Sequence, residues 1–155
     1  MDNSKWISQL ATNVKELILG SIDSDDDNRA FEVTLPFPPT VNTYWRRVGN
    51  KTLLSAHARQ YHKDCAYFLA GSVKPIDYPV MAHVEFVLPD RRKRDLDNYA
   101  KALFDTLVKN NTLLDDSLIK ACFNYFTYPG KEIWMDCFGM KKSYVNIQLF
   151  KIPLN

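Results

Sequence analysis

The sequence predicts one α/β (α+β-like) domain in which a small mixed β-sheet is flanked by helices. Its 155 residues suit a single domain, and 46% of them are apolar, which is enough for a real core. Segments with the two-residue period of strands alternate with segments of helical period. Their order, β, β, α, β, α, β, β, is typical of a sheet with helices packed on it.

The chain is predicted to divide into residues 1–29, an N-terminal amphipathic helix with an acidic linker, and a compact domain over 30–155. The helix is expected over residues 4–19, because its apolar side chains share one stripe, and Gly20 ends it. Residues 1–30 carry three basic and six acidic groups, a net −3, whereas the remainder carries 17 and 12, a net +5. A basic body is compatible with a polyanionic partner.

The first half of the domain begins with a half-buried strand, because apolar and polar residues alternate from Phe31 to Leu35. Prolines end this strand, and a polar and aromatic loop is expected over 40–47. A short strand over 51–54 follows. Ser55 is a good N-cap for a helix over 56–70.

The second half is predicted to place a strand over 80–88 before a helix over 97–109, whose apolar face contains Leu103. Strands are then expected over 119–126 and from Val145 onward. Pro129-Gly130 is expected to form a turn between them.

The cellular setting is predicted to be cytoplasmic and soluble, without a membrane. No apolar run reaches the roughly 18–20 residues that span a bilayer, and Met1–Lys5 lacks the order of a secretory signal. Cys65, Cys122 and Cys137 show no Cys-x-x-Cys pair, so buried, reduced thiols are expected in place of disulfides or a zinc site.

Four carboxylates form the candidate active site: Asp95, Asp97, Asp115 and Asp116. The first two are spaced to point the same way, and the second pair precedes the strand over 119–126. If that strand lies beside the strand over 80–88, all four can converge. Gathered carboxylates repel unless a cation neutralises them, and carboxylate oxygens are ligands that Mg²⁺ and Mn²⁺ prefer.

Cations surround these acids. Arg91, Arg92, Lys93 and Arg94 precede Asp95 and can neutralise phosphates, and Lys101 lies one helical turn after Asp97. The alternatives are that Asp97 only caps a helix, that Asp115-Asp116 is only a turn, and that the basic run is a solvated loop or a localisation patch. Asp105 is interpreted as a salt-bridge partner. Tyr44 and Trp45 are interpreted as core residues in preference to base-stacking ones.

Two ordered blocks carry a resemblance to a known family. One is TLPFPPTVNTYWR from Thr34 to Arg46, followed by Leu54-Ser55-Ala56 and Tyr61. The other is PDRRKRDLDN from Pro89 to Asn98, followed by KALFD from Lys101 and LDDS from Leu114. In these blocks, which cover roughly residues 31–126, the sequence resembles the RusA family of Holliday-junction resolvases.

The resemblance implies a RusA-like homodimer that cuts four-way DNA junctions by paired symmetric nicks with Mg²⁺ or Mn²⁺. The family's essential carboxylates fall on Asp95, Asp97 and Asp116, and its essential lysine on Lys101. Asp115 is implied to assist as a metal ligand. DNA contacts are expected from the basic run at 91–94, with help from Arg46 and Arg47.

The sequence departs from the family at Leu118, where a polar residue is frequent, and at Phe126, where a basic one is frequent. The segment 128–142 also looks longer than in compact members. These departures motivate an alternative, a branched-DNA-binding protein that does not cut. An Asp-x-Asp transferase is disfavoured, because no second domain and no Gly-rich phosphate loop are present.

Overall fold

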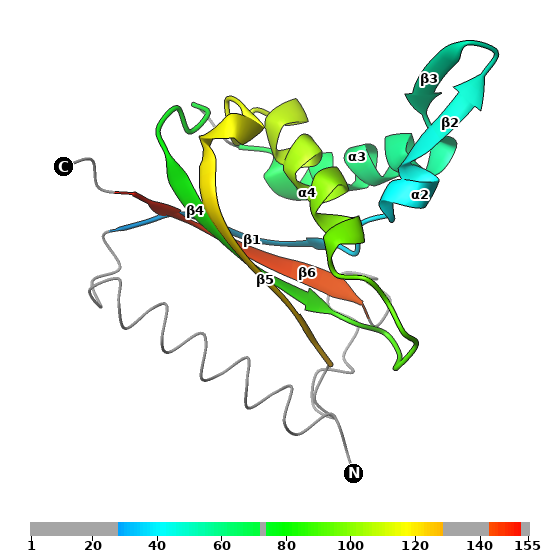
Figure 1. The fold of residues 1–155 in the computed structure, drawn as a ribbon. Coiled ribbons are helices and arrows are strands. Elements are labelled where there is room, and N and C mark those ends of the chain that lie inside the picture. Colours follow the sequence, from blue (N-terminus) through cyan, green and yellow to red (C-terminus); the bar gives the residue numbers. More distant parts are fainter. Residues whose placement is uncertain (1–27, 72–73, 129–142, 153–155) are drawn as a thin grey trace.

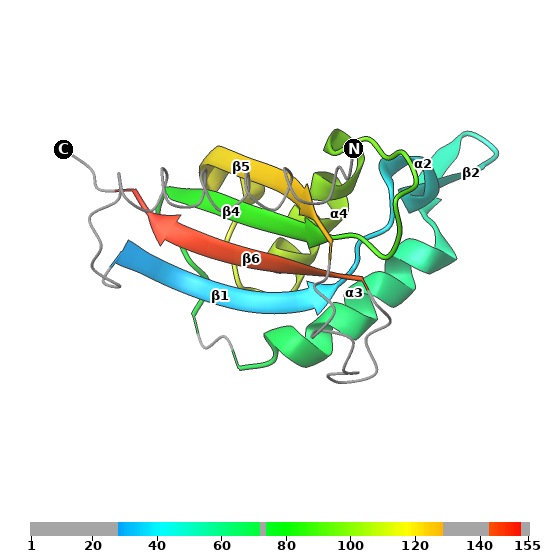
Figure 2. The ribbon, with the colours of Figure 1, turned by 90° about the horizontal axis from the view of Figure 1, so that it is seen from below.

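A four-stranded mixed sheet forms the framework of the molecule (Figure 1). The computed structural model describes residues 28–71, 74–128 and 143–152. The strands lie in the order β1 (Arg29–Pro36), β6 (Tyr144–Lys151), β4 (Val80–Val87) and β5 (Ile119–Thr127), as Figure 2 shows. β6 is antiparallel to both β1 and β4, whereas β4 and β5 are parallel. The predicted mixed sheet with helices is confirmed.

The parallel pair β4 and β5 is joined by helix α4 (Asp97–Lys109) and the short 3₁₀ helix η2 (Asp116–Leu118). Parallel neighbouring strands need such a crossover, because the chain must return to the end of the sheet at which the first strand began. The bounds of α4 are those that the sequence predicts. Asn111 follows the helix with a φ of 57°, a conformation that asparagine tolerates better than most residues.

Helix α3 (Ala56–Leu69) packs beside α4 on the same face of the sheet (Figures 1 and 2). The Ser55 side chain accepts a hydrogen bond from the Ala58 amide at 3.0 Å, which confirms the predicted N-cap. The Ser55 hydroxyl also donates to the Thr43 carbonyl at 2.6 Å. The cap therefore fixes the start of α3 to the segment before it.

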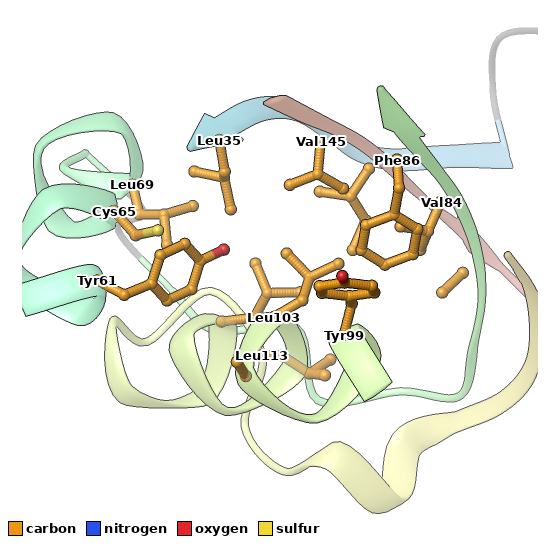
Figure 3. Packing of buried hydrophobic residues seen from close by; sticks show 14 of the residues in the cluster. Leu35, Tyr61, Cys65, Leu69, Val84, Phe86, Tyr99, Leu103, Leu113 and Val145 are labelled. Carbon is orange, nitrogen blue, oxygen red and sulfur yellow. The ribbon is translucent and has the colours of Figure 1, made fainter. Parts of the chain in front are cut away.

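The core lies between the sheet and the two helices (Figure 3). Leu103 on α4 is fully buried together with Leu35 and Val145 from the sheet. The Tyr99 ring packs edge-on against Phe37, with centroids 5.0 Å apart. Tyr99 also contacts Phe86 and Phe126, so aromatic packing anchors the first turns of α4 on the sheet.

The segment over 40–47 corrects the prediction of a loop. It forms a single helical turn, α2 (Val41–Tyr44), and then strand β2 (Trp45–Val48), which pairs with β3 (Lys51–Leu54). The resulting hairpin projects from the body (Figure 1). Every β2 side chain is exposed, so the strand has no apolar-polar alternation by which the sequence could reveal it.

Other expectations divide between the described residues and the rest. The N-terminal helix, the Pro129-Gly130 turn and Cys137 lie outside the described residues. Cys65 is a buried thiol as expected, but Cys122 is an exposed one, because it lies on the edge strand β5. Among the described residues, no helix combines the length and apolarity needed to cross a bilayer.

Candidate active site

Helix α4 presents Asp97, Lys101 and Asp105 along one side, because residues four apart lie one turn above another. The opposite side carries Leu103 and Leu107, which are fully buried. Burial of that apolar side fixes the rotation of the helix. The core therefore determines that Asp97 and Lys101 are exposed, whereas Asp105 is partly buried beside Tyr44.

Asp97 is the first residue of α4, and its side chain makes no capping hydrogen bond. The N-cap position is Leu96, so the interpretation of Asp97 as a helix cap is wrong. A carboxylate in the first turn is still favourable beside the positive end of the helix dipole. Asp95 is also exposed, and its backbone carbonyl accepts from the Asn98 amide at 3.3 Å.

The second pair of acids has divided roles. Asp115 Oδ1 accepts from the Ser117 amide at 2.8 Å and caps η2. The Ser117 side chain, and after it this amide, holds the pKa of Asp115 below its ordinary value. Asp116 is exposed and lies on the side of Lys101, with its Oδ2 3.9 Å from Lys101 Nζ. The turn interpretation thus describes Asp115, whereas Asp116 faces the charged side of α4.

Lys101 is held by a chain of polar contacts that reaches into the core. Lys101 Nζ donates to Asp105 Oδ1 at 2.7 Å, which confirms Asp105 as a salt-bridge partner. Tyr44 Oη donates to the other oxygen of Asp105 at 2.8 Å. Asp105 is the main cause of a raised pKa at Lys101, so this ammonium stays charged over the whole neutral range.

Behind Asp105, Tyr44 Oη lies 2.9 Å from His62 Nε2. The phenol has one proton and gives it to Asp105, so His62 Nε2 carries the proton that is donated to the phenol oxygen. Tyr44 is buried, as expected for a core residue. The sequence could not reveal this contact, because Tyr44 and Asp105 are 61 positions apart.

Protonation of His62 should weaken the fold. Burial lowers the pKa of the His62 imidazole below its usual 6.5, and the charge of Lys109 adds to this effect against the opposing charge of Asp105. The folded state therefore binds the proton more weakly than the unfolded state. Stability is full above about pH 6.5 and falls as the pH drops below it.

We expect the free energy of unfolding, measured with urea, to decrease from about pH 7 to about pH 5. The decrease should be smaller in His62→Gln, which removes the titrating imidazole. His57→Gln, at an exposed position of the same helix, is the control and should keep the wild-type decrease. An equal decrease in wild type and His62→Gln would contradict this assignment.

The predicted convergence of all four carboxylates is not found. Within residues 28–71, 74–128 and 143–152, no group of three or more Asp, Glu, His or Cys is close enough to hold an ion. β4 and β5 do lie side by side, but parallel pairing places Ile119 beside Val80, at the start of β4. Asp95 and Asp97 come after the opposite end of β4. Helix α4 is about 18 Å long at 1.5 Å per residue, so Asp97 lies in its first turn whereas Asp115 and Asp116 follow its last turn.

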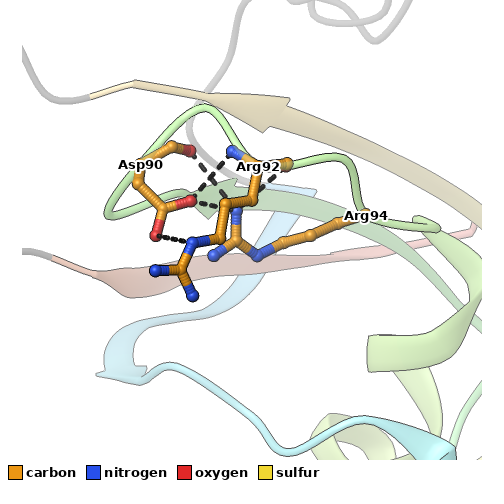
Figure 4. A network of polar contacts seen from close by, with 3 residues as sticks. All are labelled: Asp90, Arg92 and Arg94. Atoms are coloured by element: carbon orange, nitrogen blue, oxygen red, sulfur yellow. Dashed lines mark hydrogen bonds and ion pairs between the residues drawn. The ribbon is translucent and has the colours of Figure 1, made fainter.

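The basic run before α4 is organised by Asp90 (Figure 4). Asp90 Oδ1 accepts from Arg94 Nη1 at 2.7 Å and from the Arg92 amide at 2.9 Å. Arg94 is the main cause of a pKa near 2 at Asp90. The Arg94 side chain is only 17% exposed and also donates to two backbone carbonyls of the loop.

These contacts divide the predicted DNA-binding residues into one that holds the loop in shape and others whose side chains are exposed. Arg94 shapes the loop, whereas the side chain of Arg92 remains 85% exposed. Arg91 and Lys93 are exposed in the same loop, and Arg46 and Arg47 are exposed on β2. The structure therefore places cations both before the first turn of α4 and on the projecting hairpin.

The fold and these side chains define an α/β domain with an exposed acidic and lysine-containing surface that is flanked by cations. The profile of the family Endodeoxyribonuclease RusA matches residues 36–133. The chain belongs to this family. The match contains Arg46, the basic run at 91–94, Lys101 and all four acids.

Named relatives agree with the family match. The crossover junction endodeoxyribonuclease rusA of Enterobacteria phage 82 is 41% identical over 91 residues, which are 57% of this chain and 76% of the relative. The crossover junction endodeoxyribonuclease RusA of Escherichia coli strain K12 is 38% identical over the same shares of both chains. The protein of that name from Shigella sonnei strain Ss046 is 37% identical, with equal coverage.

Proposed function

We propose that this chain is a divalent-metal-dependent endodeoxyribonuclease that resolves four-way DNA junctions by paired nicks. The observation that carries the proposal is the contact between Lys101 and Asp116, within the span that matches the RusA family. The named relatives are crossover junction endodeoxyribonucleases. A four-way junction has two equivalent strands to cut, and a homodimer would present one site to each.

The proposed ligands of Mg²⁺ or Mn²⁺ are Asp95, Asp97 and Asp116, with Asp115 assisting. Their chemistry fits, because all four are exposed carboxylates and these ions prefer oxygen donors. No three of them are close enough to share an ion in the described residues, so a bound ion would have to draw the side chains together. Asp115 is the weakest candidate, since its Oδ1 already caps η2. A bound ion would polarise a phosphoryl oxygen and lower the pKa of water.

The proposed role of Lys101 is to stabilise the negative charge that develops on the phosphate. Its ammonium is held 2.7 Å from Asp105 and is directed toward Asp116. A cation already held in position pays little reorganisation cost when the phosphate becomes more negative. Asp105, supported by Tyr44, therefore acts as a positioning residue.

The proposed DNA contacts come from two elements. Arg91, Arg92 and Lys93 lie in the loop before α4, and Arg46 and Arg47 lie on β2. Arginine can neutralise phosphate with two parallel hydrogen bonds. Arg94 contributes mainly by holding the loop through Asp90.

A branched-DNA-binding protein that does not cut is the second candidate. It is motivated by Leu118 and Phe126, which stand where family members often carry a polar and a basic residue. Against it stand the exposed acids, because carboxylates beside phosphates weaken binding unless an ion or a reaction uses them.

A cleavage assay separates the two candidates. Four-way junctions and matched linear duplexes would be incubated with Mg²⁺, Mn²⁺ or EDTA, using wild type and Asp97→Asn. We expect paired nicks in junctions, only with a divalent ion, and none with Asp97→Asn. Tight junction binding without nicks under every ion would favour the binder, and undiminished cutting by Asp97→Asn would refute the proposed site.

A further inference from the structure

A cavity of about 470 Å³ lies between the hairpin and the second half of α4. Eight residues line it: Tyr44, Trp45, Leu54, Asp105, Val108, Lys109, Asp115 and Asp116. It thus joins α2, the hairpin, α4 and η2. The cavity contains Asp116, so a molecule that enters it is adjacent to the proposed reaction site.

The lining of this cavity combines apolar and charged residues. Trp45, Leu54 and Val108 are the apolar ones. The three carboxylates of the lining are met by Lys109 within it and by Lys101, which pairs with Asp105 and Asp116 from outside it. The lining therefore offers no excess of positive charge to a phosphate, whereas an uncharged aromatic ring can pack on the apolar residues.

Trp45 is an exposed aromatic residue that the core holds in place. Its side chain is 42% exposed, although the preceding Tyr44 is buried. The two rings meet edge to face, with centroids 4.9 Å apart and an interplanar angle of 90°. Tyr44 is itself fixed by Asp105 and His62, so the indole is a preorganised surface in the lining of the cavity.

The charges around Trp45 indicate what kind of molecule would carry an aromatic ring into the cavity. Residues 45–54 contain three cations, Arg46, Arg47 and Lys51, and no acidic residue. All three are exposed on the hairpin. A ligand with an uncharged ring in the cavity and phosphates along the cationic hairpin would be a nucleotide within a DNA strand.

We propose that this cavity receives one unstacked base of the junction DNA, with the Trp45 indole as its stacking surface. The inference rests on the proposed function and adds the residue that holds the strand beside Asp116. Base pairs at the exchange point of an open junction lack a stacking neighbour on one side, so one of their bases costs less to withdraw than a base inside a continuous duplex. The interpretation of Trp45 as a core residue is wrong, because the residue is exposed, and the proposal assigns it to substrate positioning.

The test measures binding without cleavage. Junctions in which one nucleotide beside the exchange point is replaced by an abasic nucleotide, one position at a time, are titrated with protein in EDTA. At one position, loss of the base should raise the wild-type Kd by about 5-fold or more, since stacking of one base on an aromatic ring has an effect of this order. With Trp45→Leu, which keeps an apolar side chain but no ring, the Kd should be the same with and without the base.

Two controls accompany this measurement. Trp45→Phe should restore part of the difference, because phenylalanine keeps a stacking face. Tyr67→Leu removes another exposed aromatic ring, 78% exposed on α3 and outside the cavity, and should keep the full wild-type difference. Thermal unfolding of each variant verifies that the proteins compared are folded.

The outcomes separate this inference from the proposed function. Base discrimination in wild type that persists in Trp45→Leu, or no discrimination at any position, would overturn the stacking role while junction binding and cleavage stand. A protein that binds junctions no better than linear duplexes would overturn the proposed function, and the stacking role with it.

Discussion

Replacement of Asp116 by asparagine is expected to reduce the rate of junction cleavage on the order of 100- to 1,000-fold. The change keeps the size of the side chain but removes the negative charge that lies 3.9 Å from Lys101 Nζ. It therefore removes both a proposed metal ligand and one of the two carboxylates beside the ammonium. Single-turnover cleavage with Mg²⁺, together with junction binding in EDTA, measures the effect, and binding should be retained.

The neighbouring residue provides a matched control. Asp115→Asn keeps the oxygen that accepts from the Ser117 amide, so the cap on η2 remains. We expect its cleavage rate to fall by less than about 10-fold, because Asp115 has only an assisting role. Equal losses in the two variants, or full activity of Asp116→Asn, would show that the roles of the two acids are not divided in this way.

Truncation of Leu103 to alanine should have the largest effect on stability. Leu103 is fully buried in the middle of α4, between the helix and the sheet (Figure 3). Removing its buried methyl groups leaves a cavity and should lower the free energy of unfolding by about 2–5 kcal/mol. Urea denaturation followed by circular dichroism measures the change.

Leu114→Ala is the comparison, because it makes the same chemical change at a side chain that is 58% exposed. Its free energy of unfolding should stay within about 0.5 kcal/mol of wild type. A loss at Leu114 as large as that at Leu103 would contradict the placement of the core. A loss at Leu103 alone would support the burial that fixes the outward side of α4.

The elements that the sequence predicts well are those with a strong one-sided pattern. α4 has a clear apolar stripe around Leu103, and its bounds agree with the prediction. β2 has no such pattern, since all four of its residues are exposed. Its pairing with β3 depends on the turn at Gly49, which has a φ of 59°, and a prediction based on periodicity misses such a contact.

In the candidate site too, the sequence predicts contacts within one element but not contacts between elements. The spacing of Lys101 and Asp105 indicates their salt bridge, because both lie on one helix. The contact of Tyr44 with Asp105 arises only when separate elements pack together. The divided positions of the acids depend on the direction of β5 relative to β4, which local sequence does not specify.

The order of strands in the sheet also determines when the protein can fold during its synthesis. β6 is the last described strand along the chain, yet it lies between β1 and β4. The first strand therefore has no partner strand until β6 has been synthesised and has left the ribosome. Until then β1 exposes both of its edges, and the four-stranded framework beneath α4 cannot be completed.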